Sequence, residues 1–215
     1  MFFLVIISMK RLLNIAVAAL VALAPLCGQT KAEFRNAKND AASAARSLKR
    51  EGFKTIELGD PSSLLERYFL KVQSGCQQIV GTAEDCITLN LAKTTALANA
   101  ANEYATLDGG VVRGRIVSST SSMSGEQLDN VVASYERLVQ KEIKGELIPY
   151  VTCVRTRKDR YSVRIYCLVD ADEASKARRR ALELALEEQS LVQAYGSLVS
   201  DWIDEGFSDA GDGND

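Results

Sequence analysis

The chain has 215 residues with 26 basic and 28 acidic side chains, a formal net charge of -2 and no histidine. A chain of this length can bury one sizeable core. Its slight acidic excess argues against nucleic acid as the main partner, because phosphate backbones attract positive charge. The absence of histidine excludes Ser-His-Asp and Cys-His catalysis and histidine-bearing zinc sites. We therefore expect a protein that is not an enzyme and that has no catalytic residues, metal or cofactor.

The first 32 residues have the pattern of a secretory signal peptide. Lys10 and Arg11 precede an uncharged apolar run over residues 12–26, and small residues follow as far as Ala32. A basic start, an apolar stretch and a small-residue cleavage site are the parts of such a leader, so Met9 is the expected true start. The run is shorter than the roughly 20 residues of a membrane-spanning helix. We expect cleavage after Ala32 and export to the periplasm, the cell envelope or the medium.

Cys27 leaves a second interpretation of the leader open. It follows the apolar run as a lipidated bacterial cysteine does, although Leu26 precedes it where a small residue is expected. We favour cleavage after Ala32 and keep lipidation of Cys27 as the alternative. The protein would contact a membrane only through that lipid or through an uncleaved leader.

Two helices separated by a short strand are predicted after the leader. Residues 36–51 form an alanine-rich helix with one apolar face, and Gly52 is placed to end it. Residues 53–58 alternate in polarity as a strand does. Asp60 begins the next helix as an N-cap followed by proline, and Gly75 ends it.

A longer helix is predicted over residues 87–107, where many small side chains indicate close approach to another backbone. Gly109 and Gly110 then interrupt it. Residues 111–118 are rich in β-branched side chains and predict a strand, with a helix that bends at the glycines as the alternative. A capping box at Ser124 begins a further helix over residues 125–144.

The clearest strand pattern is a β-hairpin over residues 147–169, with Lys158 and Asp159 as its turn. This register defines three cross-strand pairs on one face, which we expect to be buried. The pairs are Val154 with Val163, Thr152 with Ile165, and Tyr150 with Cys167. The opposite face carries Arg155, Arg164 and Tyr166, and we expect it to face solvent, with an interaction surface as the alternative.

From Ala174 onward the chain is predicted to form a long helix with apolar residues at three-four spacing, as in a coiled coil. The consecutive residues Arg178, Arg179 and Arg180 are assigned to its solvated side. After Gly206 the acidic tail at 207–215 is expected to be disordered. The apolar positions that we assign to self-association are Leu184, Leu191, Tyr195, Leu198 and Trp202.

Four cysteines remain after the leader, and export would allow them to form disulfides. Cys76 and Cys86 are candidates for a bridge that closes a short loop between two helices. Cys153 and Cys167 lie on adjacent strands, but the register places them on opposite faces of the sheet, so we do not expect them to pair.

Three stretches carry a resemblance to a known family: AARSLKREGFKTIELGDPSSLLERYF, ITLNLAKTTALANAANEYA and LIPYVTCVRTRKDRYSVRIYCLVD. In composition and order they resemble an uncharacterised family of small secreted or periplasmic proteins of Bacteroidetes. More distantly, the chain is similar to small envelope lipoproteins and to the N-terminal domain of a flagellar assembly protein. The resemblance implies a helix-on-sheet fold and an envelope location, and it implies no active-site residue.

We therefore predict one α+β domain over residues 33–206, in which an antiparallel sheet containing the hairpin packs against the helices at 87–107 and 125–144, with a long C-terminal helix. The predicted function is that of a non-enzymatic, exported cell-envelope or secreted protein. It would act as an interaction or structural module that binds an envelope protein or a second copy of itself. The alternative is a small-ligand-binding protein, or a histidine-independent enzyme, with a cleft between sheet and helices.

Overall fold

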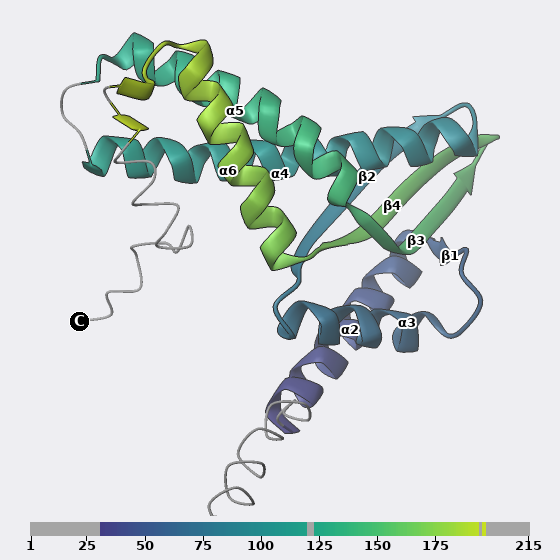
Figure 1. Ribbon diagram of the computed structural model, residues 1–215. Helices are drawn as coiled ribbons and strands as arrows, with labels where there is room; N and C mark the ends of the chain where they lie inside the picture. Colours follow the sequence, from purple (N-terminus) through teal and green to yellow (C-terminus); the bar gives the residue numbers. More distant parts are fainter. Residues whose placement is uncertain (1–30, 120–122, 194, 197–215) are drawn as a thin grey trace, which may run out of the picture. The chain divides into compact units, whose positions relative to one another are not determined.

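The computed structural model describes residues 31–119, 123–193 and 195–196. Contacts divide the chain into two units, residues 1–36 and 37–215, and the sheet and the helices that cover it belong to the second unit (Figure 1). The leader with Cys27, the positions Leu198 and Trp202, and the acidic tail lie outside the described residues. Within the described part, no helix combines the length and the apolar character needed to cross a membrane.

An antiparallel sheet forms the centre of the second unit, in the order β1-β3-β4-β2. The strands are β1 (Lys54–Thr55), β2 (Gln77–Cys86), β3 (Ile148–Arg157) and β4 (Arg160–Val169). The predicted strand at 53–58 is therefore present but reduced to two residues, and β2 was not predicted. The sheet with its helices confirms the predicted α+β class.

The hairpin of β3 and β4 turns at Lys158 and Asp159, whose φ angles are 48° and 59°. Two left-handed residues give the turn the twist that joins adjacent antiparallel strands. The predicted pairs of Val154 with Val163 and Thr152 with Ile165 are confirmed. The predicted pair of Tyr150 with Cys167 is wrong. The register shifts between Pro149 and Val151, so that Pro149 lies opposite Cys167 and Tyr150 occupies a bulge.

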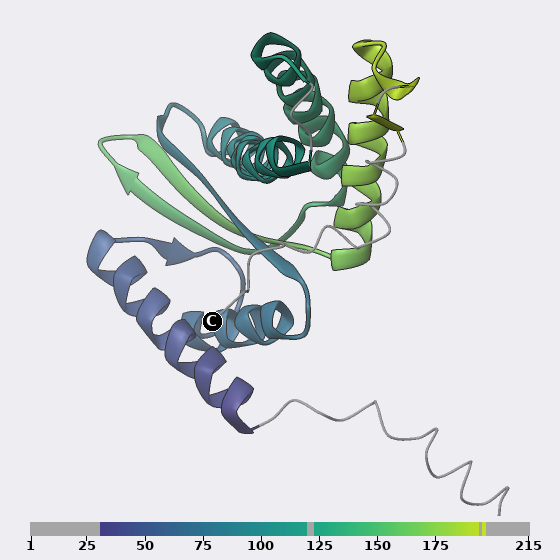
Figure 2. The same cartoon turned by 90° about the vertical axis from the view of Figure 1, so that its left-hand side faces the viewer.

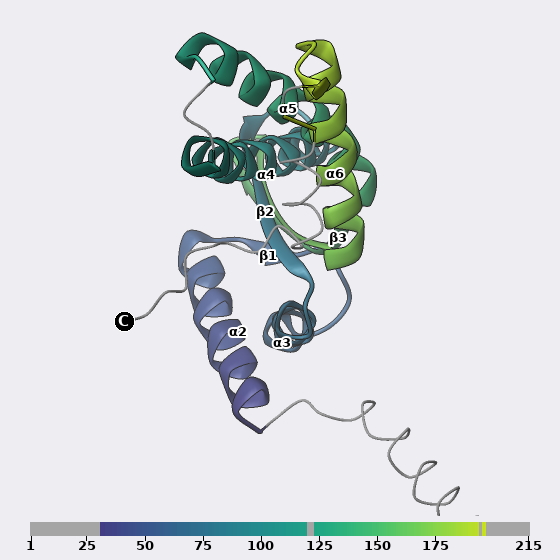
Figure 3. The same cartoon turned by 60° about the vertical axis from the view of Figure 1, so that its left-hand side comes forward.

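One face of the sheet is covered by three helices, α4 (Leu89–Ser119), α5 (Gly125–Glu146) and α6 (Ala171–Glu188). Figures 2 and 3 show them on the side of the sheet away from α2 and α3. Helix α4 packs directly on β2 and β4, whereas α5 packs mainly on α4 and α6. The prediction that both helices lie on the sheet therefore holds for α4 and is corrected for α5.

The predicted strand at 111–118 is wrong, because α4 continues through the glycines as far as Ser119. Val112 and Ile116 are buried in the core on the inner side of this helix. A Cβ at Gly109 would lie 2.5 Å from Cγ of Glu136 on α5. The glycine therefore permits close packing of two helices, and burial of the inner side outweighs the local strand preference of the β-branched residues.

The other face of the sheet is covered by α2 (Lys31–Glu51) from Ala37 onward and by α3 (Pro61–Gln73). The predicted C-terminal end of α2 and the predicted start of α3 are confirmed, whereas α2 begins at Lys31 rather than at residue 36. Gly52 adopts a φ of +82° after α2, and the Asp60 carboxylate accepts the Ser63 N–H over 2.9 Å at the start of α3. Tyr68 of α3 is buried against the sheet, and its hydroxyl donates to the carbonyl of Cys167 over 3.2 Å.

The C-terminal helix is shorter than predicted. Helix α6 ends at Glu188, and Ser190 then adopts a φ of +56°, which interrupts the predicted seam. Leu184 is 41% exposed, while Leu182 and Leu186 are buried. Within the described residues, the seam therefore does not run along one continuous helix.

The predicted bridge between Cys76 and Cys86 is wrong. Both thiols are free, as are those of the buried Cys153 and Cys167. The segment between Cys76 and Cys86 is the ten-residue strand β2 rather than a loop. Such a strand spans about 30 Å, whereas the Cα atoms of a disulfide lie within roughly 7 Å of each other. Cys153 and Cys167 lie in the cores on opposite faces of the sheet, as predicted.

Alkylation of the native protein should therefore separate the cysteines into two pairs. Burial raises the pKa of Cys153 to about 12 and that of Cys167 to about 11, so both remain protonated and inaccessible. Iodoacetamide at about pH 8 is expected to label the half-buried Cys76 and Cys86 and to label the other two only after denaturation. Peptide mass spectrometry without reduction checks this, and a peptide cross-linked between Cys76 and Cys86 would contradict it.

Candidate functional site

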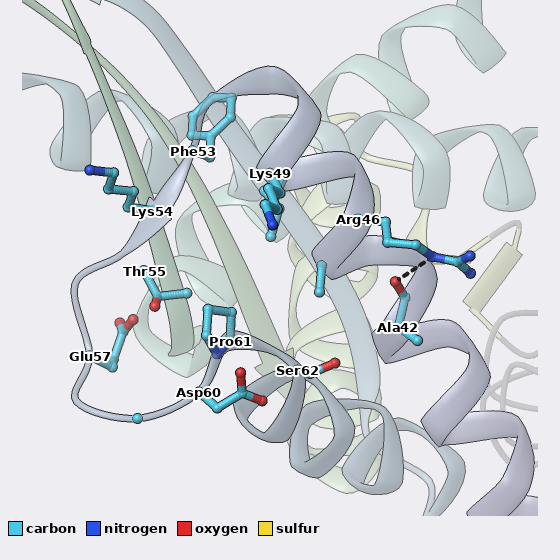
Figure 4. Close-up of a pocket in the computed structure, with 13 residues that line it drawn as sticks. Ala42, Arg46, Lys49, Phe53, Lys54, Thr55, Glu57, Asp60, Pro61 and Ser62 are labelled. Carbon is cyan, nitrogen blue, oxygen red and sulfur yellow. Dashed lines mark hydrogen bonds between the residues drawn. The ribbon is translucent and has the colours of Figure 1, made fainter.

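A groove with a volume of about 860 Å³ lies between α2, β1 and the beginning of α3 (Figure 4). Its walls come from two neighbouring stretches of the chain, the second half of α2 and the segment that leads through β1 into α3. The residues with aliphatic or aromatic side chains that line it are Ala42, Ala45, Leu48, Phe53 and Pro61.

The wall formed by α2 follows from helical spacing. Ala42, Ala45, Arg46 and Lys49 occur at three-four intervals and therefore share one side of the helix. The side chains of the two alanines are small. They therefore leave space for the groove between α2 and the loop before α3. Leu48 is buried beside them and joins the wall to the core under the sheet.

The facing wall is a loop with unusual exposure of apolar side chains. It connects β1 to α3 and includes Glu57, Gly59 and Asp60 among the residues that line the groove. The same loop exposes Ile56 by 47% and Leu58 by 98%. These two side chains belong to the loop that forms the wall but do not themselves line the groove.

Basic side chains stand at the rim of the groove. Figure 4 shows Lys49 on α2 between Phe53 and Arg46, Lys54 directed outward from β1 and Arg46 directed away along α2. The Arg46 Nε donates to the carbonyl of Ala42 over 3.0 Å. Lys49 and Lys54 form no ion pair with any residue that the structure describes. Lys49 is therefore an available positive charge on the α2 wall of the groove.

The acids at the groove serve the fold. Asp60 caps α3 through its carboxylate, and the Glu57 Oε1 accepts the Thr152 N–H over 2.8 Å. Glu57 thereby extends the pairing of the short β1 along the edge of β3, since Ile56 donates its own N–H to the Thr152 carbonyl. Each of the two acids therefore has a hydrogen-bonding role within the fold.

Phe53 connects the groove to the sheet. The guanidinium groups of Arg155 and Arg164 lie 4.9 and 5.0 Å from the centre of its ring, a geometry of cation–π contact. Each arginine also has a carboxylate partner: Arg155 pairs with Glu84 over 2.6 Å and Arg164 with Glu51 over 2.7 Å. The pairing lowers the pKa of Glu51.

The predicted solvent face of the hairpin is therefore wrong. Tyr166 is buried, and its ring centre lies 5.5 Å from that of Tyr68 in an edge-to-face arrangement. Arg155 and Arg164 face α2 and Phe53 rather than bulk water. An interaction face was predicted at Arg155, Arg164 and Tyr166. These three side chains instead contact other residues of the same chain and lie beneath the groove.

A second polar group joins the three helices on the other face. Asp108 of α4 is buried and accepts a hydrogen bond from the Tyr135 hydroxyl of α5. Arg178 of α6 places its Nε 2.9 Å from the Asp108 Oδ1, and its guanidinium lies 5.5 Å from the ring centre of Tyr104. Arg178, predicted to be solvated, is only 16% exposed in its side chain, which corrects that prediction. We assign this group to stability, because it joins three helices in the core.

The remaining predicted positions do not gather at a site. Leu191 and Tyr195 are partly buried against the core of the three-helix face, whereas Leu184 is exposed. Arg180 pairs with Glu142 of α5 over 2.8 Å. Among the described residues, no group of three potential metal-ligating side chains lies close enough to hold an ion.

Sequence reasoning missed the groove. Its residues are common types, alanine, lysine and proline, and none occurs in a motif with a known ligand. The only local indication was Leu58, an apolar residue directly before the Gly59-Asp60-Pro61 turn. Comparison of the chain with protein-family models, with characterised proteins and with solved structures gives no match.

Proposed function

We propose that this chain is a non-enzymatic, exported binding module of the cell envelope, or a secreted one, and that the groove between α2, β1 and α3 is its binding site. The groove carries this proposal, because apolar side chains from α2 and from the segment that leads into α3 line it. Its volume of about 860 Å³ is within the range of small-molecule sites. The leader pattern in the first 32 residues supports the exported location.

The geometry favours small-ligand binding over the enzyme alternative. The carboxylates at the groove, Glu57 and Asp60, accept backbone N–H groups of the chain itself. A histidine-independent hydrolase needs a pair of acids, or an activated serine or lysine, facing one cavity. Self-association through Leu191 and Tyr195 has less support, because both side chains pack against the chain's own core.

Filling the groove tests the proposal. The variant Ala45→Phe places a ring between α2 and the facing loop, and we expect it to weaken binding of an apolar ligand at least tenfold. That loss corresponds to about 1.4 kcal/mol. The neutral dye N-phenyl-1-naphthylamine is a suitable probe, because its fluorescence rises when it enters an apolar site. Titration of the wild-type protein should show saturable binding.

Ala133→Phe is the matched control, because Ala133 is an exposed helical alanine on α5, on the other side of the sheet. It adds the same ring without touching the groove, so dye binding should remain at the wild-type level. Circular dichroism shows whether both variants keep the fold. Equal dye binding by the Ala45→Phe and wild-type proteins would refute the groove as the binding site.

A further inference from the structure

We propose that the ligand of the groove is a single-chain anionic amphiphile, with an apolar body between α2 and the loop before α3 and an acidic head group held by Lys49. This inference rests on the proposed function and names the chemical class of its ligand. The protein would bind one free molecule of a long-chain acid, such as a fatty acid, rather than a membrane surface.

The apolar body follows from the lining of the groove. Ala42, Ala45, Leu48, Phe53 and Pro61 form one apolar surface. The groove is open to solvent along the loop that exposes Ile56 and Leu58. An alkyl chain in this position would remove its own surface and the apolar lining of the groove from water, a gain of about 25 cal/mol per Å² of apolar area.

The acidic head group follows from the charges at the rim. Lys49 lines the groove from α2 (Figure 4), is exposed and forms no ion pair with a described residue. The Glu57 Oε1 and the Asp60 Oδ2 accept backbone N–H groups over 2.8 and 2.9 Å, and neither acid forms an ion pair with Lys49. A ligand carboxylate is the complementary group, because it would pair with an ammonium that has no competing acid bound to it.

The basic residues around the groove and the net charge of the chain favour a free ligand over a membrane surface. A protein that docks on an anionic membrane presents a patch of several unpaired basic residues. At this groove, Arg46 folds onto the Ala42 carbonyl, while Arg155 and Arg164 beneath Phe53 are already paired with acids. The chain as a whole carries a net charge of -2. Arg46, Lys49 and Lys54 line the groove without an acid partner among the described residues, but Arg46 and Lys54 are directed away from it (Figure 4), which leaves Lys49 for a single head group.

Calorimetric titration with two amphiphiles of equal chain length and opposite head group tests this inference. Dodecanoate is expected to bind the wild-type protein with 1:1 stoichiometry, and dodecyltrimethylammonium at least tenfold more weakly. Lys49→Gln should lower the affinity for dodecanoate on the order of tenfold and leave binding of the cation unchanged. Lys54→Gln, at the outward-directed lysine of the same rim, should have a smaller effect.

Lys141→Gln on α5 is the control for a general change in charge and should bind like the wild type. Equal affinity for the two amphiphiles, or equal effects of Lys49→Gln and Lys141→Gln, would overturn the assignment of the head group. If the naphthylamine dye still bound in a manner sensitive to Ala45→Phe, the proposed function would survive that result. Sedimentation with phosphatidylglycerol vesicles that persists in Ala45→Phe would assign Lys49 to a membrane surface and also overturn the inference.

Discussion

Replacing Asp108 by alanine is expected to lower the free energy of unfolding by about 3–5 kcal/mol, the usual cost of removing one partner from a buried ion pair. The carboxylate connects three helices, since it accepts from Tyr135 of α5 and pairs with Arg178 of α6 while belonging to α4. Its loss would leave a largely buried guanidinium without its carboxylate and a buried hydroxyl without its acceptor. Alanine has a higher helix propensity than aspartate. Helix propensity would therefore oppose the loss of stability rather than cause it.

The protonation states in this group support that expectation. Burial and the nearby Asp108 charge raise the pKa of Tyr135 well above its ordinary value, so its hydroxyl keeps the proton that it donates. The same two causes raise the pKa of Tyr104 to about 12. Arg178 remains charged, with a raised pKa, because the attraction of Asp108 and the neighbouring tyrosines opposes the effect of burial. The charge that Asp108 balances therefore persists across the ordinary pH range.

Urea unfolding followed by circular dichroism measures the loss. The matched control is Asp129→Ala, because Asp129 pairs with Arg113 over 2.7 Å between α4 and α5 but both side chains are largely exposed. That substitution should cost less than about 1 kcal/mol. Similar losses for the two variants would show that Asp108 is not a buried anchor.

A double variant separates the net contribution of the ion pair to stability from the cost of leaving one of its partners unpaired. Replacing both Asp108 and Arg178 by leucine removes the two charges together, and buried ion pairs exchanged for apolar residues are often neutral in stability. The double variant should therefore be more stable than Asp108→Ala, although Tyr135 would still lack its acceptor. Its stability measures how far unpaired charge, rather than lost packing, determines the effect of the single substitution.

The parts of the fold that were predictable from sequence are those fixed by local chemistry. Asp60 before a proline, the capping box at Ser124 and the turn at Lys158 and Asp159 each form with neighbours a few residues away. Their outcomes depend on hydrogen bonds and backbone angles that the short stretch supplies itself. The hairpin register followed from the turn and failed only at Tyr150, where a bulge adds one residue.

The errors concern choices that tertiary packing decides. Val112 and Ile116 favour a strand by propensity, yet they lie in a helix because both are buried in its packed inner side. Arg155 and Arg164 alternate with apolar residues as solvated side chains do, but Phe53, Glu51 and Glu84 from distant segments cover them. The sequence of the hairpin alone does not predict those partners.

The groove was unpredictable for the same reason. Ala45 and Lys49 belong to a helix that would look the same against any apolar surface. They line a cavity only because β1 pairs with β3 and brings the loop before α3 beside them. The strand β1 is two residues long and depends on the Glu57 side chain to extend its pairing. A site formed in this way has no sequence motif.

The small side chains of α4 were expected to allow another backbone to approach, and β2 is that backbone. A Cβ at Gly81 of β2 would collide with the Ala96 carbonyl oxygen and lie 2.8 Å from the Ala100 Cβ. Ala92, Ala96 and Ala100 are all buried on this side of α4. The helix and the strand are therefore in backbone contact at Gly81, with no room for a methyl group.

Gly81→Ala is accordingly expected to destabilise the protein by about 2–3 kcal/mol, at the upper end of the cost of overpacking a core. The obstructing atoms are a backbone carbonyl and a Cβ, which can give way only if α4 moves as a whole.

Gly110→Ala provides the control on α4 itself, because no atom lies within 4 Å of a Cβ at that position. Removing an exposed glycine from a helix should stabilise the protein by about 0.5–1 kcal/mol. The same substitution should thus shift the urea midpoint in opposite directions at the two positions, and a neutral Gly81→Ala would contradict the contact between α4 and β2.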